Sequence, residues 1–146
     1  MLPGQGAEAL ASESPIRVVL VDDHQLFADA LTLLLERDDR VAIVGTAPTA
    51  EAGIELVVAN DAQVVVMDVS MPGIDGLEAT RRLREVKPDV AVIILSGTAD
   101  YADAARAAGA AGYLTKGRVH DEVVDAILSA TGHHADDLPD GDGLPR

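Results

Sequence analysis

The sequence predicts an α/β fold in which a five-stranded, mostly parallel sheet is covered on both faces by helices. Short apolar runs rich in β-branched residues occur five times, and such runs are typical of strands buried on both faces. Each run is followed by a segment with the apolar spacing of an amphipathic helix, and the connections are short. This strict alternation of strand and helix favours parallel strands with helices on either side.

Length and composition fit one soluble domain. The chain has 146 residues, 48% of them hydrophobic, which is enough for one core of ordinary size. It has no cysteine, which excludes disulfides and thiolate metal sites. No apolar stretch approaches the length of a membrane span and the first residues do not resemble a signal peptide, so we expect a cytoplasmic protein that contacts no membrane. The net charge of −14 repels a phosphate backbone, so the chain alone should bind DNA poorly.

The first half of the chain supplies three strands and two helices. The apolar runs cover residues 17–21, 41–45 and 64–68. The helix after the first run is expected to bury one stripe, made of Leu26, Ala30, Leu33 and Leu34. Thr49 is predicted to cap the next helix, whose inner stripe would be Ala50, Ile54, Val57 and Val58.

The second half supplies two strands, at residues 90–95 and 112–115, and three helices. The helix over 76–86 should turn Ala79, Leu83 and Val86 inward, and the last helix should bury Val119, Val123, Ala126, Ile127 and Ala130. The helix from about residue 100 to 108 has an apolar face that is almost wholly alanine. Because alanine buries little area, we expect this helix to be the least firmly held.

The two ends of the chain differ in composition from the middle. Residues 1–15 are small and polar and predict a flexible leader, and residues 16–131 form a single domain. Residues 132–146 are rich in Asp, Gly and Pro, which predicts a disordered acidic tail or the start of a linker.

Polar and charged residues stand where four of the predicted strands end. These residues are Asp22 and Asp23, Asp68, Ser96 and Lys116. Because the carboxyl ends of parallel strands meet at one edge of a sheet, we expect their side chains to converge. Three adjacent carboxylates repel each other unless a cation lies among them, and oxygen ligands of this kind suit Mg²⁺.

A carboxylate nucleophile, a divalent cation, a lysine and a hydroxyl together suit phosphoryl transfer, with Asp68 attacking in line to become an aspartyl phosphate. Taken singly, each residue has an ordinary explanation: Asp22 and Asp23 as a helix cap, Ser96 as a turn residue and Lys116 as a solvated side chain. Their joint placement at four strand ends favours a site.

Four segments resemble the receiver domain of two-component response regulators. They are Val21-Asp22-Asp23-His24, then Met67-Asp68-Val69-Ser70-Met71-Pro72-Gly73-Ile74-Asp75-Gly76, then Leu95-Ser96-Gly97, and last Gly112-Tyr113-Leu114-Thr115-Lys116. They occur in the family's order, and the resemblance spans roughly residues 16–130. The stretches Asp-Asp-His-Gln-Leu-Phe and Gly-Ala-Ala-Gly-Tyr-Leu resemble the NarL/FixJ subfamily, whose members usually add a C-terminal helix-turn-helix domain.

The resemblance implies a flavodoxin-like fold with strand order 2-1-3-4-5 and a role for each matching residue. Asp68 would be the phospho-acceptor and Lys116 and Ser96 would assist it, while Ser96 and Tyr113 would form the switch. Mg²⁺ would be held by Asp22, Asp23, Asp68 and the backbone carbonyl of Ser70. The phosphoryl donor would be a sensor histidine kinase. Phosphorylation would promote a homodimer. Transcription would be regulated, and DNA reached, only through a missing helix-turn-helix output domain; otherwise the chain would act as a stand-alone receiver.

Other functions remain open at this stage. A receiver-like docking module that is never phosphorylated is the main alternative, although such domains usually lose part of the acidic pair or the lysine. An enzyme with an aspartate nucleophile is disfavoured, because the first strand ends in two adjacent Asp residues and no segment is long enough for a cap domain. A flavodoxin-like nucleotide-binding protein is disfavoured because no glycine-rich loop follows the first strand. We expect a regulatory phospho-acceptor that catalyses its own phosphorylation and slow dephosphorylation, and not an enzyme.

Overall fold

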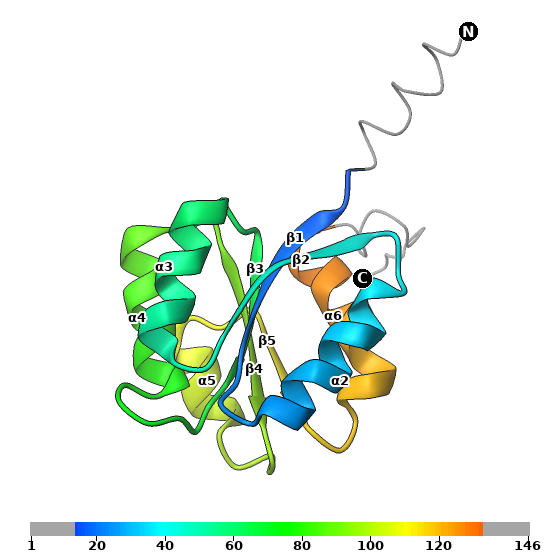
Figure 1. The fold of residues 1–146 in the computed structure, drawn as a ribbon. Helices are drawn as coiled ribbons and strands as arrows, with labels where there is room; N and C mark the ends of the chain where they lie inside the picture. Colours follow the sequence, from blue (N-terminus) through cyan, green and yellow to red (C-terminus); the bar gives the residue numbers. More distant parts are fainter. Residues whose placement is uncertain (1–13, 133–146) are drawn as a thin grey trace, which may run out of the picture.

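The computed structural model describes residues 14–132, and this part of the chain folds as alternating strands and helices. The predicted leader and tail lie almost wholly outside these residues. The elements, labelled as in Figure 1, are β1 (Ile16–Val21), α2 (Gln25–Glu36), β2 (Val41–Ala47), α3 (Ala50–Asn60), β3 (Val64–Asp68), α4 (Gly76–Val86), β4 (Ala91–Ser96), α5 (Ala102–Ala108), β5 (Gly112–Thr115) and α6 (Val119–Ala130).

All five strands are parallel and lie in the order β2-β1-β3-β4-β5. This is the predicted order 2-1-3-4-5. The chain starts inside the sheet at β1, adds β2 on one side, and then adds β3, β4 and β5 in turn on the other side. Every predicted strand is present, although β2 runs two residues further than expected, to Ala47. The register between β1 and β2 shifts between Val18 and Val19, so the pairing is irregular there.

Two hydrophobic cores lie on opposite faces of the sheet. Helices α2 and α6 cover one face, and α3, α4 and α5 cover the other (Figure 1). Because successive side chains of a strand point to opposite faces, β1 contributes Val18 and Leu20 to the first core but Val19 and Val21 to the second. The central strands are therefore buried on both sides, as their unbroken apolar runs predicted.

Helix starts follow local sequence rules. The Thr49 side chain accepts a hydrogen bond from the Ala52 N–H at 3.2 Å, which confirms the predicted cap of α3. Asp75 caps α4 in the same way, accepting from the Glu78 N–H at 2.9 Å. Helix α5 has only seven residues and buries Ala105 and Ala108, so alanine does form its inner face.

The predicted inner stripe of α2 was wrong at three of its four positions, and only Leu34 packs, partly buried, against the first core. The helix buries Ala28, Leu31 and Leu35, whereas Leu26 is 86% exposed and Leu33 is 65% exposed. Apolar residues occur on nearly every side of this helix, so spacing alone could not select the buried face. The sheet selects it, because only one orientation brings the helix against the first core.

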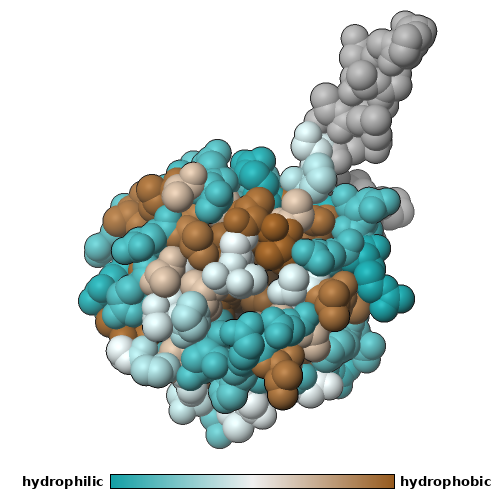
Figure 2. Space-filling model, viewed as in Figure 1, coloured by the Kyte–Doolittle hydropathy of each residue, from teal (hydrophilic) through white to brown (hydrophobic). Residues whose placement is uncertain are grey.

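The stripes of two other helices needed smaller corrections. Val58 in α3 is 55% exposed and Val86 at the end of α4 is 56% exposed, while Gly53 is buried in α3. In Figure 2, apolar patches lie among hydrophilic side chains on both the α2 side and the α3–α4 side of the molecule. Among the described residues, no helix is both long and apolar enough to cross a membrane.

Gly53 permits α3 to pack closely on β1, which leads to a prediction about stability. A Cβ atom at this position would lie 2.5 Å from Cγ2 of Val21, a stiff side chain in a buried strand. We expect Gly53→Ala to lower the free energy of unfolding by about 1–3 kcal/mol, because overpacking outweighs the higher helix propensity of alanine. Urea unfolding measures this, with Glu55→Ala on the exposed side of α3 as control. An unchanged or raised midpoint for Gly53→Ala would contradict the packing argument.

Candidate functional site

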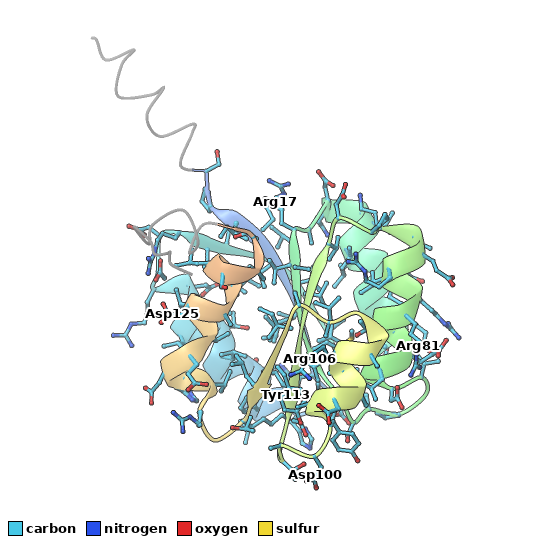
Figure 3. All side chains as sticks on the ribbon, turned by 180° about the vertical axis from the view of Figure 1, so that it is seen from behind. Arg17, Arg81, Asp100, Arg106, Tyr113 and Asp125 are labelled. Atoms are coloured by element: carbon cyan, nitrogen blue, oxygen red, sulfur yellow. The ribbon has the colours of Figure 1, made fainter. Side chains whose placement is uncertain are left out.

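The carboxyl ends of the parallel strands meet at one edge of the sheet. Figure 3 shows the opposite ends of the molecule, with Arg17 near the start of β1 at one end and Asp100 and Tyr113 towards the other. Arg17 anchors the amino-terminal edge, where its side chain contacts Asp61. The site predicted from the strand ends therefore lies away from this anchor, at the carboxyl-terminal edge.

Asp22 follows β1 directly and is buried at this edge. Its Oδ1 atom accepts a hydrogen bond from the His24 N–H at 2.8 Å, which fixes the turn into α2. Its Oδ2 atom is buried and accepts no hydrogen bond, although Lys116 Nζ lies 3.0 Å away as an ion-pair partner. A buried carboxylate oxygen that lacks a hydrogen bond is costly unless a cation balances its charge.

Asp68 is the last residue of β3, and its side chain is 4% exposed. Its Oδ1 atom accepts from the Ser70 N–H at 3.4 Å, and its Oδ2 atom accepts from Lys116 Nζ at 3.3 Å. Burial, and then the charge of Asp22, raise the pKa of the Asp68 carboxyl, while Lys116 opposes this increase. Helix α4 can start beside Asp68 because its first residue is Gly76. A Cβ atom at this position would lie only 2.5 Å from the Asp68 carbonyl oxygen.

Lys116 lies between the two buried carboxylates. Its backbone N–H donates to the Ser96 carbonyl at 2.8 Å, which holds the loop after β5 against the end of β4. The Nζ atom contacts both Asp22 and Asp68, and it lies 4.6 Å from the centre of the Phe27 ring. The ring supports the ammonium through a cation–π contact and leaves its donors directed at the carboxylates.

Asp23 and His24 complete the cluster on its solvent side. Ligand atoms of Asp22, Asp23, His24 and Asp68 all lie within 4.8 Å of one another. Three carboxylates that share the ammonium of Lys116, which contacts Asp22 and Asp68, form a set of oxygen ligands that fits a hard divalent cation. The residues present are therefore compatible with the metal predicted from the sequence.

Ser96 and Tyr113 lie at the same edge but outside the carboxylate cluster. The buried Ser96 hydroxyl accepts from the Thr98 N–H at 3.2 Å. The Tyr113 hydroxyl donates to the Thr98 carbonyl and accepts from the Tyr101 N–H. In the described part of the chain, neither hydroxyl forms a hydrogen bond to Asp68. Both side chains instead bind the loop between β4 and α5.

His24 and Phe27 were missed as site residues in the sequence. Both residues belong to the stretch Asp-Asp-His-Gln-Leu-Phe that resembles the NarL/FixJ subfamily, but that resemblance gave neither of them a role. A usable signal was present, since both lie within a few residues of the acidic pair at the start of α2. The contact of Phe27 with Lys116 depends on the packing of α2 against the β5–α6 loop, which periodicity does not reveal. His24, in contrast, contacts Asp22 and Asp23 beside it in the sequence.

Comparison with known proteins settles the family. The profile of the response regulator receiver domain matches residues 18–128. The chain belongs to this family. All four segments quoted from the sequence lie within the matched residues, and the flavodoxin-like topology predicted from the resemblance is the one found. The role that the family indicates is regulatory.

Relatives of this receiver domain include response regulators of the predicted subfamily. The response regulator UvrY of Escherichia coli (strain K12) is 43% identical over 116 residues, which cover 78% of this chain and 53% of UvrY. The response regulator GacA of Pseudomonas aeruginosa is 40% identical over 114 residues, or 77% of this chain and 53% of GacA. The receiver domain thus spans about half the length of these curated relatives.

Solved structures agree with this assignment. A LuxR-family two-component response regulator from Aurantimonas sp. SI85-9A1 matches with a TM-score of 0.77 and 34% identity, covering 82% of this chain and 86% of that one. The signal receiver domain of the putative response regulator NarL from Mycobacterium tuberculosis matches with a TM-score of 0.77 and 31% identity, covering 82% and 98%.

The raised pKa of Asp68 predicts how stability depends on pH. The pKa of the Asp68 carboxyl is higher in the folded protein than in the unfolded chain. Its contribution to folding stability is therefore fully present at pH values below the pKa of the unfolded chain, and it is lost as the pH rises through the pKa of the folded protein. Asp68→Asn removes this dependence. We therefore expect the variant to be more stable than the wild type at pH 7, with an advantage that shrinks as pH falls towards 4. Urea unfolding across this range measures the difference, and a wild type that is the more stable protein at pH 7 would refute it.

Proposed function

We propose that Asp68 accepts a phosphoryl group and that this modification switches the surface of the receiver domain. The observation that carries this proposal is the position of Asp68, buried at the end of β3 and in contact with Lys116. The carboxylate would attack phosphorus in line, so that a new P–O bond forms while the bond to the donor breaks and the leaving group departs with its electron pair.

The neighbouring residues would lower the barrier to this transfer. Lys116 Nζ lies 3.3 Å from Asp68 Oδ2. It could therefore pair with an oxygen of a phosphoryl group attached to that side chain. The carboxylates of Asp22, Asp23 and Asp68, with the Ser70 carbonyl, would hold Mg²⁺, which supplies positive charge against the phosphoryl oxygens. The domain would thus promote its own phosphorylation and a slow dephosphorylation.

The switch is proposed to pass through the β4–α5 loop. A phosphoryl group on Asp68 would attract the Ser96 hydroxyl, which now accepts from the Thr98 N–H. Because Tyr113 binds the same loop at the Thr98 carbonyl, a change at Ser96 would reach Tyr113 and the short α5 helix. The small buried area of this alanine helix would make it responsive.

The partners of the domain are also proposed from its family. A sensor histidine kinase would donate the phosphoryl group from a phosphohistidine, and phosphorylation would favour a homodimer. Because the chain spans about half of relatives such as UvrY, any regulation of transcription would use a DNA-binding output domain in a longer protein or a partner. We assign residues 16–131 to the receiver domain and propose a cytoplasmic location, with residues 1–15 as a leader and 132–146 as a tail or linker.

A docking module without phosphorylation is the alternative function. It would use the same fold and surface but would need neither Lys116 nor the full acidic cluster. Both are present and in contact, which supports the phospho-acceptor.

The experiment is an intact-mass measurement after incubation with acetyl phosphate, with and without Mg²⁺. We expect a single phosphoryl adduct that requires Mg²⁺ and is absent from Asp68→Asn. Asp29→Asn, an exposed carboxylate on α2, serves as the matched control and should retain the adduct. If the wild type gains no adduct although it binds Mg²⁺, the docking function would replace the phospho-acceptor.

A further inference from the structure

The imidazole of His24 lies among the carboxylates of the site, and the proposed phosphoryl transfer gives it no role. Its Nδ1 atom is 3.1 Å from Asp22 Oδ1, 3.4 Å from Asp23 Oδ1 and 3.8 Å from Asp68 Oδ2. One nitrogen therefore approaches an oxygen atom of all three acidic residues. Lys116 Nζ lies 3.5 Å from the same nitrogen, so the ring also borders the ammonium.

These separations match those of ligands that share one metal ion. In an octahedral site with bonds of roughly 2.1 Å, adjacent ligand atoms are about 3.0 Å apart and opposite ones about 4.2 Å apart. The three distances from His24 Nδ1 lie between these limits. The 3.1 Å contact with Asp22 is a hydrogen bond in the structure, so the nitrogen would exchange this bond for a metal ion shared with the carboxylate oxygens.

Local structure directs the ring into the site. The His24 N–H is bound by Asp22, and the His24 carbonyl accepts from the Ala28 N–H at 2.9 Å as α2 begins. Although His24 stands at the N-cap position, its side chain forms no capping hydrogen bond. The side chain is therefore not needed to start the helix, and it is 65% exposed, so its replacement should not disturb either core.

We propose that His24 is a nitrogen ligand of the divalent cation and makes the site prefer Mn²⁺ and related transition-metal ions to Mg²⁺. The inference rests on the proposed function, because it adds a ligand to the same acidic site. Carboxylate oxygens alone suit Mg²⁺, whereas an imidazole nitrogen favours transition metals, whose affinity for nitrogen exceeds that of Mg²⁺. A site with carboxylate oxygens and one imidazole nitrogen should therefore bind Mn²⁺ more tightly relative to Mg²⁺ than a site with oxygen ligands alone.

The test compares three full-length proteins: the wild type, His24→Phe and His120→Phe. His24→Phe keeps an aromatic ring but removes the nitrogen ligand. His120→Phe makes the same change at an exposed position on α6, outside the acidic cluster, and serves as the matched control. Mn²⁺ affinity is measured by electron paramagnetic resonance, Mg²⁺ affinity by competition with Mn²⁺, and nitrogen coordination by pulsed measurements of ¹⁴N coupling to bound Mn²⁺.

We expect ¹⁴N coupling in the wild type and in His120→Phe, and its loss in His24→Phe. The Mn²⁺ affinity of His24→Phe should fall about tenfold or more, while its Mg²⁺ affinity should change less than about twofold. The inference is overturned if bound Mn²⁺ shows no ¹⁴N coupling in the wild type, or if both affinities change equally. A rise in both affinities would also overturn it, because the ring would then be occupying the place of the cation.

This measurement separates the inference from the proposed function. If His24 is not a metal ligand, Mg²⁺ binding and the phosphoryl adduct on Asp68 are still expected, because neither requires a nitrogen ligand. If the wild type binds neither ion, the metal requirement of the proposed function fails together with the inference. If metal binding is as expected but no adduct forms, only the proposed function fails.

Discussion

The repulsion between carboxylates at one edge of the sheet is the constraint on which the site depends. Two of them, Asp22 and Asp68, are buried, and within the described chain one ammonium, that of Lys116, contacts both. Two like charges about 4 Å apart cost roughly 1 kcal/mol in water and about 4 kcal/mol near a protein surface. The folded domain therefore carries an excess of negative charge at this edge, and a bound cation would reduce the repulsion between the carboxylates.

The fold tolerates this cost because its two cores lie elsewhere. Alternating side chains of the central strands fill both faces of the sheet, and the carboxylates project only from the strand ends. Close packing then holds the strand ends in place, since α3 approaches β1 at Gly53 and α4 starts against β3 at Gly76. The apolar packing that stabilises the domain thus lies apart from the charged strand ends.

Much of the fold and of the site could be predicted from the sequence, because each strand is a short apolar run and the residues of the site follow directly at the strand ends. Asp22, Asp68 and Lys116 do converge as expected. The buried stripe of α2 could not be predicted, since apolar residues on several sides of that helix left the choice of face to tertiary packing. The contacts of Phe27 and His24 with Lys116 were missed for the same reason, because they depend on where α2 lies relative to that lysine.

Mg²⁺ titration of the wild type and of Lys116→Met tests most directly whether uncompensated carboxylate charge governs the site. Removing the ammonium leaves the acidic cluster more negative, so the account predicts that Mg²⁺ affinity rises by about fivefold or more. Lys87→Met, which removes an ammonium paired with Asp61 away from the acidic cluster, should leave the affinity unchanged. An affinity for Lys116→Met that equals or falls below that of the wild type would contradict the account.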